Sequence, residues 1–306
     1  MGKLIPTFTK PRDVTCKPKT TIPIDKQRKK MNKYISVISL FLLLSCSGRK
    51  ALEKYQYSNL QKIETKIFAL YPEKEIPNDN LPVERIKLEL NGRILYANWV
   101  STDSKATAFF ILHGNGETLS DWRPLQAYLL SKGYSSFVFD YTGFGSSTGK
   151  PSVSRLNEDA IEAYKKFATL TLNAKERIAF SHSLGGSMLL ETANKFKPLP
   201  NKVVTHAAFT TLREIGVEKK VFADSVKTNY PDVWNGYKNV KKLKSPLYII
   251  HSIADKTIPI WMGEELAKSG GNKVKLLKLE DAGHNIVYED PTDKTWSKIF
   301  DFINDK

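Results

Sequence analysis

The pattern of apolar and polar positions from Arg85 to the C-terminus alternates between two periods. Short apolar runs, typical of buried strands, alternate with longer segments in which apolar residues recur every three or four positions, typical of helices. The turn Asn91-Gly92 separates two strand-like segments, 86–90 and 94–100, and predicts a hairpin. Strands that alternate with helices favour a mainly parallel sheet that is covered by helices on both faces.

The remaining elements follow the same alternation. Further strands are predicted over 106–112, 134–141, 177–181, 202–208, 246–251 and 274–279. Helices are predicted over 121–132, with Ser120 as N-cap and Gly133 at its end, and over 157–170, 184–196, 261–268 and 295–304. We therefore expect one α/β domain over 85–306.

Residues 213–244 interrupt the alternation and contain no clear strand. They predict either a small cap over a site or an ordinary surface excursion. Phe222, Tyr230 and Trp234 are the aromatic residues of this segment that could contact a substrate, and packing in the core is the alternative for each.

The N-terminal region has the pattern of a targeting segment. The apolar run 34–44 is too short to span a bilayer as a helix, and it lies between a basic stretch and small residues, which is typical of a signal peptide over 31–45. The sequence Leu-Ser-Cys that ends at Cys46 resembles the bacterial lipobox, in which cleavage leaves a lipid-bearing cysteine. Cleavage nearby without lipidation and an uncleaved anchor remain alternatives.

This pattern predicts the organisation of the front of the chain. A basic region of 33 residues is abnormally long for a signal peptide, so we interpret Met31 as the start of the native product and 1–30 as outside it. Residues 46–84 would form a tether and edge segment. The predicted location is the bacterial cell envelope, with Cys46 anchored in a membrane and Ser47 indicating the outer membrane.

Charge and cysteine content exclude several classes of function. Residues 1–50 contain 12 Lys or Arg and 2 Asp or Glu, so they hold +10 of the net charge of +15. The rest of the chain is close to balanced, which argues against a nucleic-acid partner.

Cys16 and Cys46 both precede the α/β region, and the five histidines show no metal-binding spacing. We expect no metal and no cofactor. A GxGxxxG run, 143–149, differs from the dinucleotide-binding spacing.

Ser183 is the candidate nucleophile. It lies in the sequence SHSLGG, between a predicted strand and a predicted helix, which is the context of a nucleophile elbow. The usual GxSxG pattern has glycine where this chain has Ser181, and serine is small enough to fit. A helix-capping serine is the alternative, although it explains neither Gly185 nor Gly186.

Asp255 and His284 follow Ser183 in the chain order of nucleophile, acid and base. His284 would take the proton of the serine hydroxyl, and Asp255 would orient the imidazole. Asp255 could instead be a turn residue, and His284 a structural loop histidine. His182 is a poor candidate for the base, because it is adjacent to Ser183 in sequence and would point elsewhere along the turn. His206 and His251 are interpreted as core or strand-end histidines, and Asp140 as a structural residue that bonds the glycine turn after it.

Five segments in this order resemble the α/β-hydrolases over about 85–306. They are the serine elbow, HGNG at 113–116, DYTGFGSS at 140–147, IHS with Asp255 and Pro259, and AGHN at 282–285. The resemblance implies an α/β-hydrolase fold, an oxyanion hole formed by the backbone N–H groups of Leu184 and Asn115, and a bracing role for His113.

The same resemblance, to serine aminopeptidase-like and lipid-hydrolase or thioesterase branches, implies a serine hydrolase. The expected substrate is a small-molecule acyl ester or thioester, perhaps of a lipid. A peptidase or amidase of the same fold is the alternative within enzymes. A catalytically silent binding protein on this fold is the alternative outside them. Neither the acyl group nor the oligomeric state can be read from the sequence.

Overall fold

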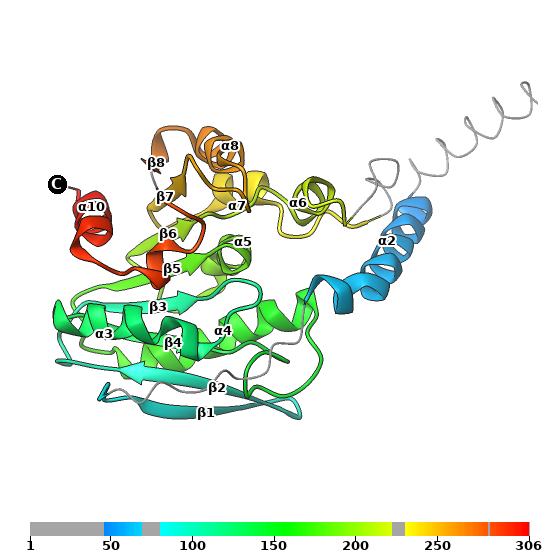
Figure 1. Cartoon of the computed structure of the whole chain (residues 1–306). Helices are drawn as coiled ribbons and strands as arrows, with labels where there is room; N and C mark the ends of the chain where they lie inside the picture. The colour runs from blue at the N-terminus through cyan, green and yellow to red at the C-terminus, as the bar shows by residue number, and fades with distance from the viewer. Residues whose placement is uncertain (1–45, 69–79, 222–229, 281, 306) are drawn as a thin grey trace, which may run out of the picture. The chain divides into compact units, whose positions relative to one another are not determined.

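The computed structural model describes residues 46–68, 80–221, 230–280 and 282–305 (Figure 1). The chain divides into two compact units, Met1–Lys54 and Tyr55–Lys306. The predicted signal peptide and the region before it lie outside the described residues. No helix in the described part of the chain combines the length and the apolar character needed to cross a membrane.

The second unit is built on one sheet of eight strands in the order β1-β2-β4-β3-β5-β6-β7-β8. The first two pairs, β1 with β2 and β2 with β4, are antiparallel, and the other five pairs are parallel. The strands are β1 Glu84–Leu90, β2 Arg93–Val100, β3 Ala108–Leu112, β4 Ser135–Phe139, β5 Arg177–His182, β6 Lys202–His206, β7 Leu247–Ser252 and β8 Val274–Leu279. The predicted hairpin and the six further strands are confirmed, with ends displaced by a few residues.

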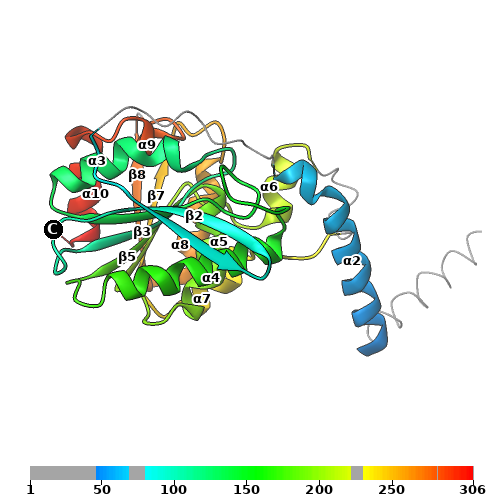
Figure 2. The same ribbon diagram turned by 90° about the horizontal axis from the view of Figure 1, so that it is seen from below.

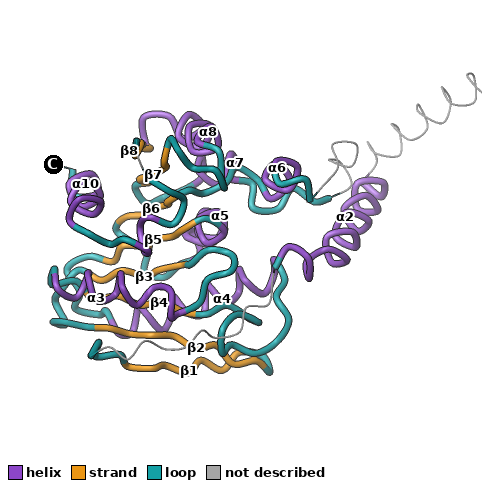
Figure 3. Tube along the Cα trace, viewed as in Figure 1, coloured by secondary structure: helices purple, strands orange, loops and turns teal. Residues whose placement is uncertain are grey.

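Helices follow most of the strands, as the colours of Figure 3 show. They are α2 Cys46–Ile67, α3 Arg123–Ser131, α4 Val153–Leu170, α5 Leu184–Thr192, α6 Leu212–Glu218, α7 Gly236–Lys242, α8 Ile260–Gly270, α9 Ile286–Glu289 and α10 Asp293–Ile303. Short 3₁₀ turns are η1 Leu119–Trp122, η2 Ala193–Lys195 and η4 Gly271–Lys273.

The helices cover both faces of the sheet, as predicted. One core cluster holds apolar residues of α4, α5, α7 and α8, and the other holds those of α3, α9 and α10. Figure 2 shows α3 and α9 on one side of the sheet and α4 and α7 on the other. Central strands are therefore buried on both faces, which explains their continuous apolar runs.

Two predicted helix starts are wrong. Ser120 is not an N-cap: it lies inside η1, which Thr118 and Asp121 close as a capping box before α3 begins at Arg123. The second helix starts at Val153 rather than 157, because Ser152 accepts a hydrogen bond from the backbone N–H of Arg155 at 3.2 Å. Such caps depend on backbone geometry that apolar periodicity does not report.

The predicted cap segment, 213–244, contains most of α6 and all of α7. Phe222 lies outside the described residues. Trp234 is 1% exposed and belongs to the core, where its ring packs edge-on against Phe68 at 6.0 Å. Its indole N–H also donates a hydrogen bond to Oδ1 of Asn157 at 2.8 Å. For Trp234, packing in the core is therefore the outcome.

Candidate active site

Ser183 occupies a strained turn between β5 and α5. Its backbone has φ 51° and ψ −117°, a conformation that non-glycine residues rarely adopt. Such a residue costs on the order of 1–3 kcal/mol and clusters at functional sites. The turn fits because Gly185 and Gly186 allow a close approach: a Cβ on Gly185 would lie 2.4 Å from the backbone oxygen of Leu112.

The two serines that replace glycines of the family pattern are accommodated by hydrogen bonds. Ser181 is fully buried, and its hydroxyl donates to the backbone oxygen of Val204 at 3.1 Å. Ser252 donates to the backbone oxygen of Ala282 and accepts from the N–H of Ala254 at 3.2 Å. Neither hydroxyl is left buried without a partner, so both substitutions fit the fold.

His284 and Asp255 lie together in the loops after β8 and β7. The Nδ1 atom of His284 is 2.7 Å from Oδ2 of Asp255. The other carboxylate oxygen accepts backbone N–H bonds from Thr257 at 2.7 Å and Ile258 at 2.9 Å. Asp255 is therefore held in one orientation, and its hydrogen bond with His284 directs the opposite nitrogen of the imidazole away from the carboxylate.

The electrostatics of this pair follow from burial and hydrogen bonding. Burial lowers the pKa of His284 below its ordinary value, and the hydrogen bond with Asp255 only partly offsets this effect. For Asp255, burial opposes ionisation, but the bonds from His284 and the backbone outweigh it and lower the pKa. At neutral pH the pair is therefore a neutral imidazole beside a carboxylate.

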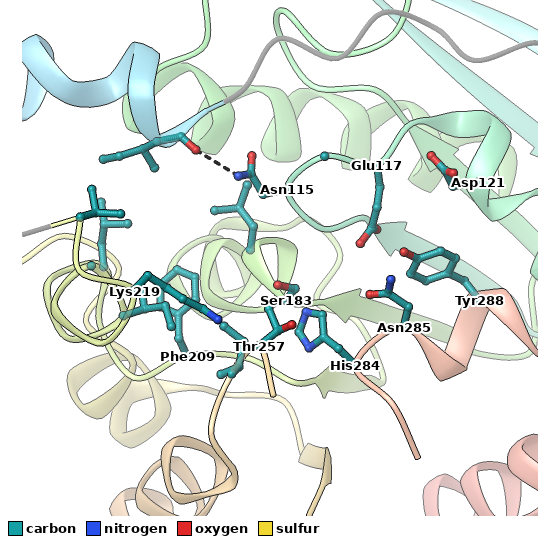
Figure 4. Close-up of a pocket in the computed structure, with 18 of the residues that line it drawn as sticks. Asn115, Glu117, Asp121, Ser183, Phe209, Lys219, Thr257, His284, Asn285 and Tyr288 are labelled. Carbon is teal, nitrogen blue, oxygen red and sulfur yellow. Dashed lines mark hydrogen bonds between the residues drawn. The ribbon is translucent and has the colours of Figure 1, made fainter. Parts of the chain in front are cut away.

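A cavity of about 640 Å³ contains Ser183 and His284. Figure 4 shows Glu117, Asp121 and Tyr288 on one side of these two residues and Phe209 and Lys219 on the other. The apolar part of the lining consists of Ile67, Leu184, Phe209, Leu212, Ile215, Val221 and Ile258. The cavity is thus apolar toward α6 and acidic toward η1 and α9.

The loop 113–116 forms another part of the cavity wall. His113 stacks on Tyr141 with ring centroids 4.0 Å apart, and its Nδ1 lies 2.8 Å from the backbone oxygen of Gly114. The Tyr141 hydroxyl donates to the backbone oxygen of His113 at 2.6 Å. These contacts match the bracing role expected for His113. The side chain of Asn115 turns away and donates to the backbone oxygen of Ile67 at 3.0 Å (Figure 4).

His206 and His251 are buried, as predicted, and so is His182. His182 lies closer to the site than the sequence indicated. The Nδ1 atoms of His182 and His206 are 2.9 Å apart, and the ring of His182 lies 4.6 Å from that of His284. His251 bonds through Nε2 with the backbone oxygen of Ile258 at 2.8 Å. Asp140 is fully buried, as expected of a structural residue, and a Cβ on Gly145 of the glycine turn would come within 2.0 Å of its Oδ2. Its Oδ1 also accepts a hydrogen bond from the N–H of Leu119 at 3.0 Å.

Sequence reasoning missed Glu117. This carboxylate lines the cavity and is only 6% exposed. An acidic residue directly after the loop 113–116 was the available signal. Its burial and its contacts with Trp122 of η1 and His182 of β5 cannot be read from spacing. Within the described ranges, no group of three or more His, Cys, Asp or Glu side chains is arranged to hold a metal ion.

Comparison with known proteins agrees with this architecture. A family model described as the alpha/beta hydrolase fold matches residues 107–232. The esterase Pf2001 of Pyrococcus furiosus superposes with a TM-score of 0.61 at 17% identity, covering 76% of this chain and 96% of that one. The chain has the α/β-hydrolase fold.

Two further proteins are similar to this chain along part of its sequence. The alpha/beta hydrolase domain-containing protein 17B of Xenopus tropicalis is 29% identical over 189 residues, 61% of this chain and 63% of the relative. The lysophosphatidylserine lipase ABHD12 of Danio rerio is 26% identical over 227 residues, 64% of this chain and 58% of the relative. The chain thus spans less than two thirds of either relative.

Proposed function

We propose that this α/β-hydrolase is a serine hydrolase that cleaves carboxylic esters or thioesters through an acyl-serine intermediate. The observation that carries the proposal is the cavity in which Ser183, on its strained turn, and the His284–Asp255 pair lie together. Nucleophilic catalysis by a serine requires a base oriented to take its proton, which the neutral imidazole of His284 can provide. Backbone strain of the kind found at Ser183 clusters at functional sites.

The chemistry proceeds in two halves. His284 takes the proton from the Ser183 hydroxyl as the oxygen attacks the acyl carbonyl, and the tetrahedral intermediate then expels the alcohol or thiol, which receives that proton from His284. Water attacks the acyl-serine in the same way and releases the acid. Asp255 stabilises the imidazolium that forms in each half.

The negative oxygen of the tetrahedral intermediate needs donors at the start of α5 and in the loop 113–116. We assign the backbone N–H of Leu184 and that of Asn115, two residues that line the cavity beside Ser183. Because the amide side chain of Asn115 bonds to Ile67 instead, its role here is limited to its backbone. Loss of one such donor typically lowers the rate by about 10²- to 10³-fold.

The lining of the cavity supports an acyl group with apolar character. Aliphatic and aromatic side chains from α6 and its neighbours form one wall of the cavity. Burial of a methylene group against such a wall contributes about 0.8 kcal/mol. Two similar proteins carry the names esterase and lysophosphatidylserine lipase, which supports ester bonds, including those of lipids, as substrates.

A membrane tether at Cys46 belongs to the same proposal. Its support is the lipobox-like sequence Leu-Ser-Cys after a short apolar run. Several acyl chains on one cysteine would hold the enzyme at the membrane of a bacterial cell envelope, because each buried methylene adds to the affinity.

A fluorophosphonate probe tests the serine chemistry directly. The folded protein is expected to label, and Ser183→Ala is expected to lose both labelling and ester hydrolysis, because the nucleophile is removed. A panel of p-nitrophenyl esters of increasing chain length, measured beside aminoacyl-arylamides, defines the bond that is cleaved. Labelling that persists in Ser183→Ala, or no labelling of folded wild-type protein, would contradict the proposal.

A further inference from the structure

Glu117 connects three parts of the site that are distant in sequence. Its Oε2 accepts the backbone N–H of Gly114 at 2.6 Å and the indole N–H of Trp122 at 2.9 Å. Its Oε1 lies 3.3 Å from Nε2 of His182, the residue before Ser183. One carboxylate therefore links the loop 113–116, the 3₁₀ turn η1 and the end of β5.

The loop is shaped to admit this carboxylate. A Cβ on Gly114 would come within 2.4 Å of Oε1 of Glu117, so glycine at this position lets the side chain fold back onto the backbone of the loop. Bonds of this kind, from a backbone N–H to an ionised oxygen, are stronger than those between neutral groups. Asn115 follows Gly114 directly, so the position of its N–H depends on the same bond.

Glu117 also contributes charge close to the imidazole of the triad. His182 stands between them, with its ring 4.6 Å from that of His284. Burial favours the neutral form of Glu117, but His182 and the N–H of Gly114 more than compensate and lower its pKa. The carboxylate is therefore ionised at neutral pH, in a part of the site shielded from water.

We propose that Glu117 is a positioning residue that holds the oxyanion loop in register with Ser183 and maintains negative charge behind His284. The proposal rests on the serine-hydrolase function proposed above. It assigns a role to the acidic side of the cavity, which the chemistry of the triad leaves unexplained.

Two substitutions separate the two parts of this role. Glu117→Ala removes the acceptor for the N–H of Gly114. We expect kcat to fall by about 10- to 100-fold, while KM for short esters changes less than about threefold. The reason is that a small misplacement of an oxyanion donor affects mainly the transition state. Glu117→Gln keeps the shape and one acceptor oxygen, so the loss in kcat is expected to be smaller.

The pH profile of kcat/KM tests whether the charge of Glu117 acts on His284. The titratable groups that interact with His284 are Asp255 from the loop after β7, Glu117 from the loop after β3, His182 from β5, His206 from β6 and His251 from β7. Negative charge raises the pKa of His284, and Glu117→Gln removes one such charge. The acid limb of kcat/KM, which requires neutral His284, is therefore expected to move to lower pH in Glu117→Gln.

Glu64→Gln is the matched control. Glu64 is also a buried carboxylate that accepts a backbone N–H, from Val153 at 2.9 Å, but it lies outside the cavity. It is expected to leave kcat and the acid limb unchanged. Wild-type kcat and acid limb in both Glu117 variants, or a loss of folded yield alone, would overturn the inference. Failure of wild-type protein to react with the fluorophosphonate would instead overturn the proposed function.

Discussion

At the scale of single residues, reactivity in this cavity depends on how hydrogen bonds orient a few side chains. Asp255 uses one oxygen for backbone N–H groups and the other for His284. The first set of bonds fixes the carboxylate, and the second selects one tautomer of the imidazole. In the proposed mechanism this tautomer leaves the opposite nitrogen free to take the serine proton. Orientation and charge are thus supplied by one side chain.

Asp255→Asn separates these two contributions. The amide oxygen retains the bonds from Thr257 and Ile258, while the amide nitrogen faces Nδ1 of His284 and favours the wrong tautomer. We expect kcat for an ester substrate to fall by about 10³- to 10⁴-fold. Steady-state kinetics measure the loss in kcat, and a circular dichroism spectrum that matches the wild type shows that the variant is folded. A loss of less than tenfold in correctly folded protein would contradict the assigned role of Asp255.

At the scale of elements, the site is assembled by the carboxyl ends of parallel strands. The loops after β3, β5, β7 and β8 supply 113–116, Ser183, Asp255 and His284, which span more than half of the sequence of the second unit. Parallel pairing brings the same end of each strand to one edge of the sheet. Close packing of α5 against the end of β3 then fixes the serine turn.

Gly185→Ala tests this close packing. The added Cβ would lie 2.4 Å from the backbone oxygen of Leu112 and 2.6 Å from that of His113, and backbone atoms cannot swing aside as a side chain can. We expect a loss of about 1–3 kcal/mol in the free energy of unfolding. Urea denaturation measures it.

Gly283→Ala provides the comparison for that measurement, because a Cβ at Gly283 meets no atom within 4 Å. Its effect on the free energy of unfolding is expected to stay within about 0.5 kcal/mol. Equal stability of the Gly185 and Gly283 variants would show that α5 can shift without cost, contrary to the packing described here.

At the scale of the whole molecule, the chain combines a strongly basic N-terminal region with a remainder whose charges are close to balanced. Residues 1–50 hold two thirds of the net charge, +10 of +15. The unit that contains the sheet and the cavity begins at Tyr55, nine residues after Cys46. We interpret this division as an address segment followed by a catalytic unit, which agrees with the proposed tether.

Cys46→Ser tests the tether. In a diderm bacterial host the wild-type protein is expected in the membrane fraction, with the mass of a lipid on its N-terminal cysteine, while the serine variant is expected in the soluble fraction. Ester hydrolysis should follow the protein into that fraction, because Cys46 lies outside the compact unit that contains the cavity. Wild-type protein whose Cys46 carries no lipid mass would contradict lipidation at this residue.

Much of this architecture could be predicted because the relevant signals are local. The hairpin at Asn91-Gly92, the apolar strands and the order of Ser183, Asp255 and His284 all depend on neighbours in sequence. Helix starts were predicted less well, since the caps at Thr118 and Ser152 are set by hydrogen bonds between side chains and backbone N–H groups. Apolar periodicity reports which face of a helix is buried but not where its first turn closes.

The sequence by itself therefore determined the α/β-hydrolase fold and the residues placed at the strand ends, because periodicity and short motifs act over a few positions. Only the tertiary structure decided how Ser181 and Ser252 satisfy their hydroxyls, that Trp234 enters the core and that Glu117 reaches Gly114, Trp122 and His182. These outcomes depend on atoms brought together by strand pairing and helix packing, and sequence spacing carries no record of such contacts.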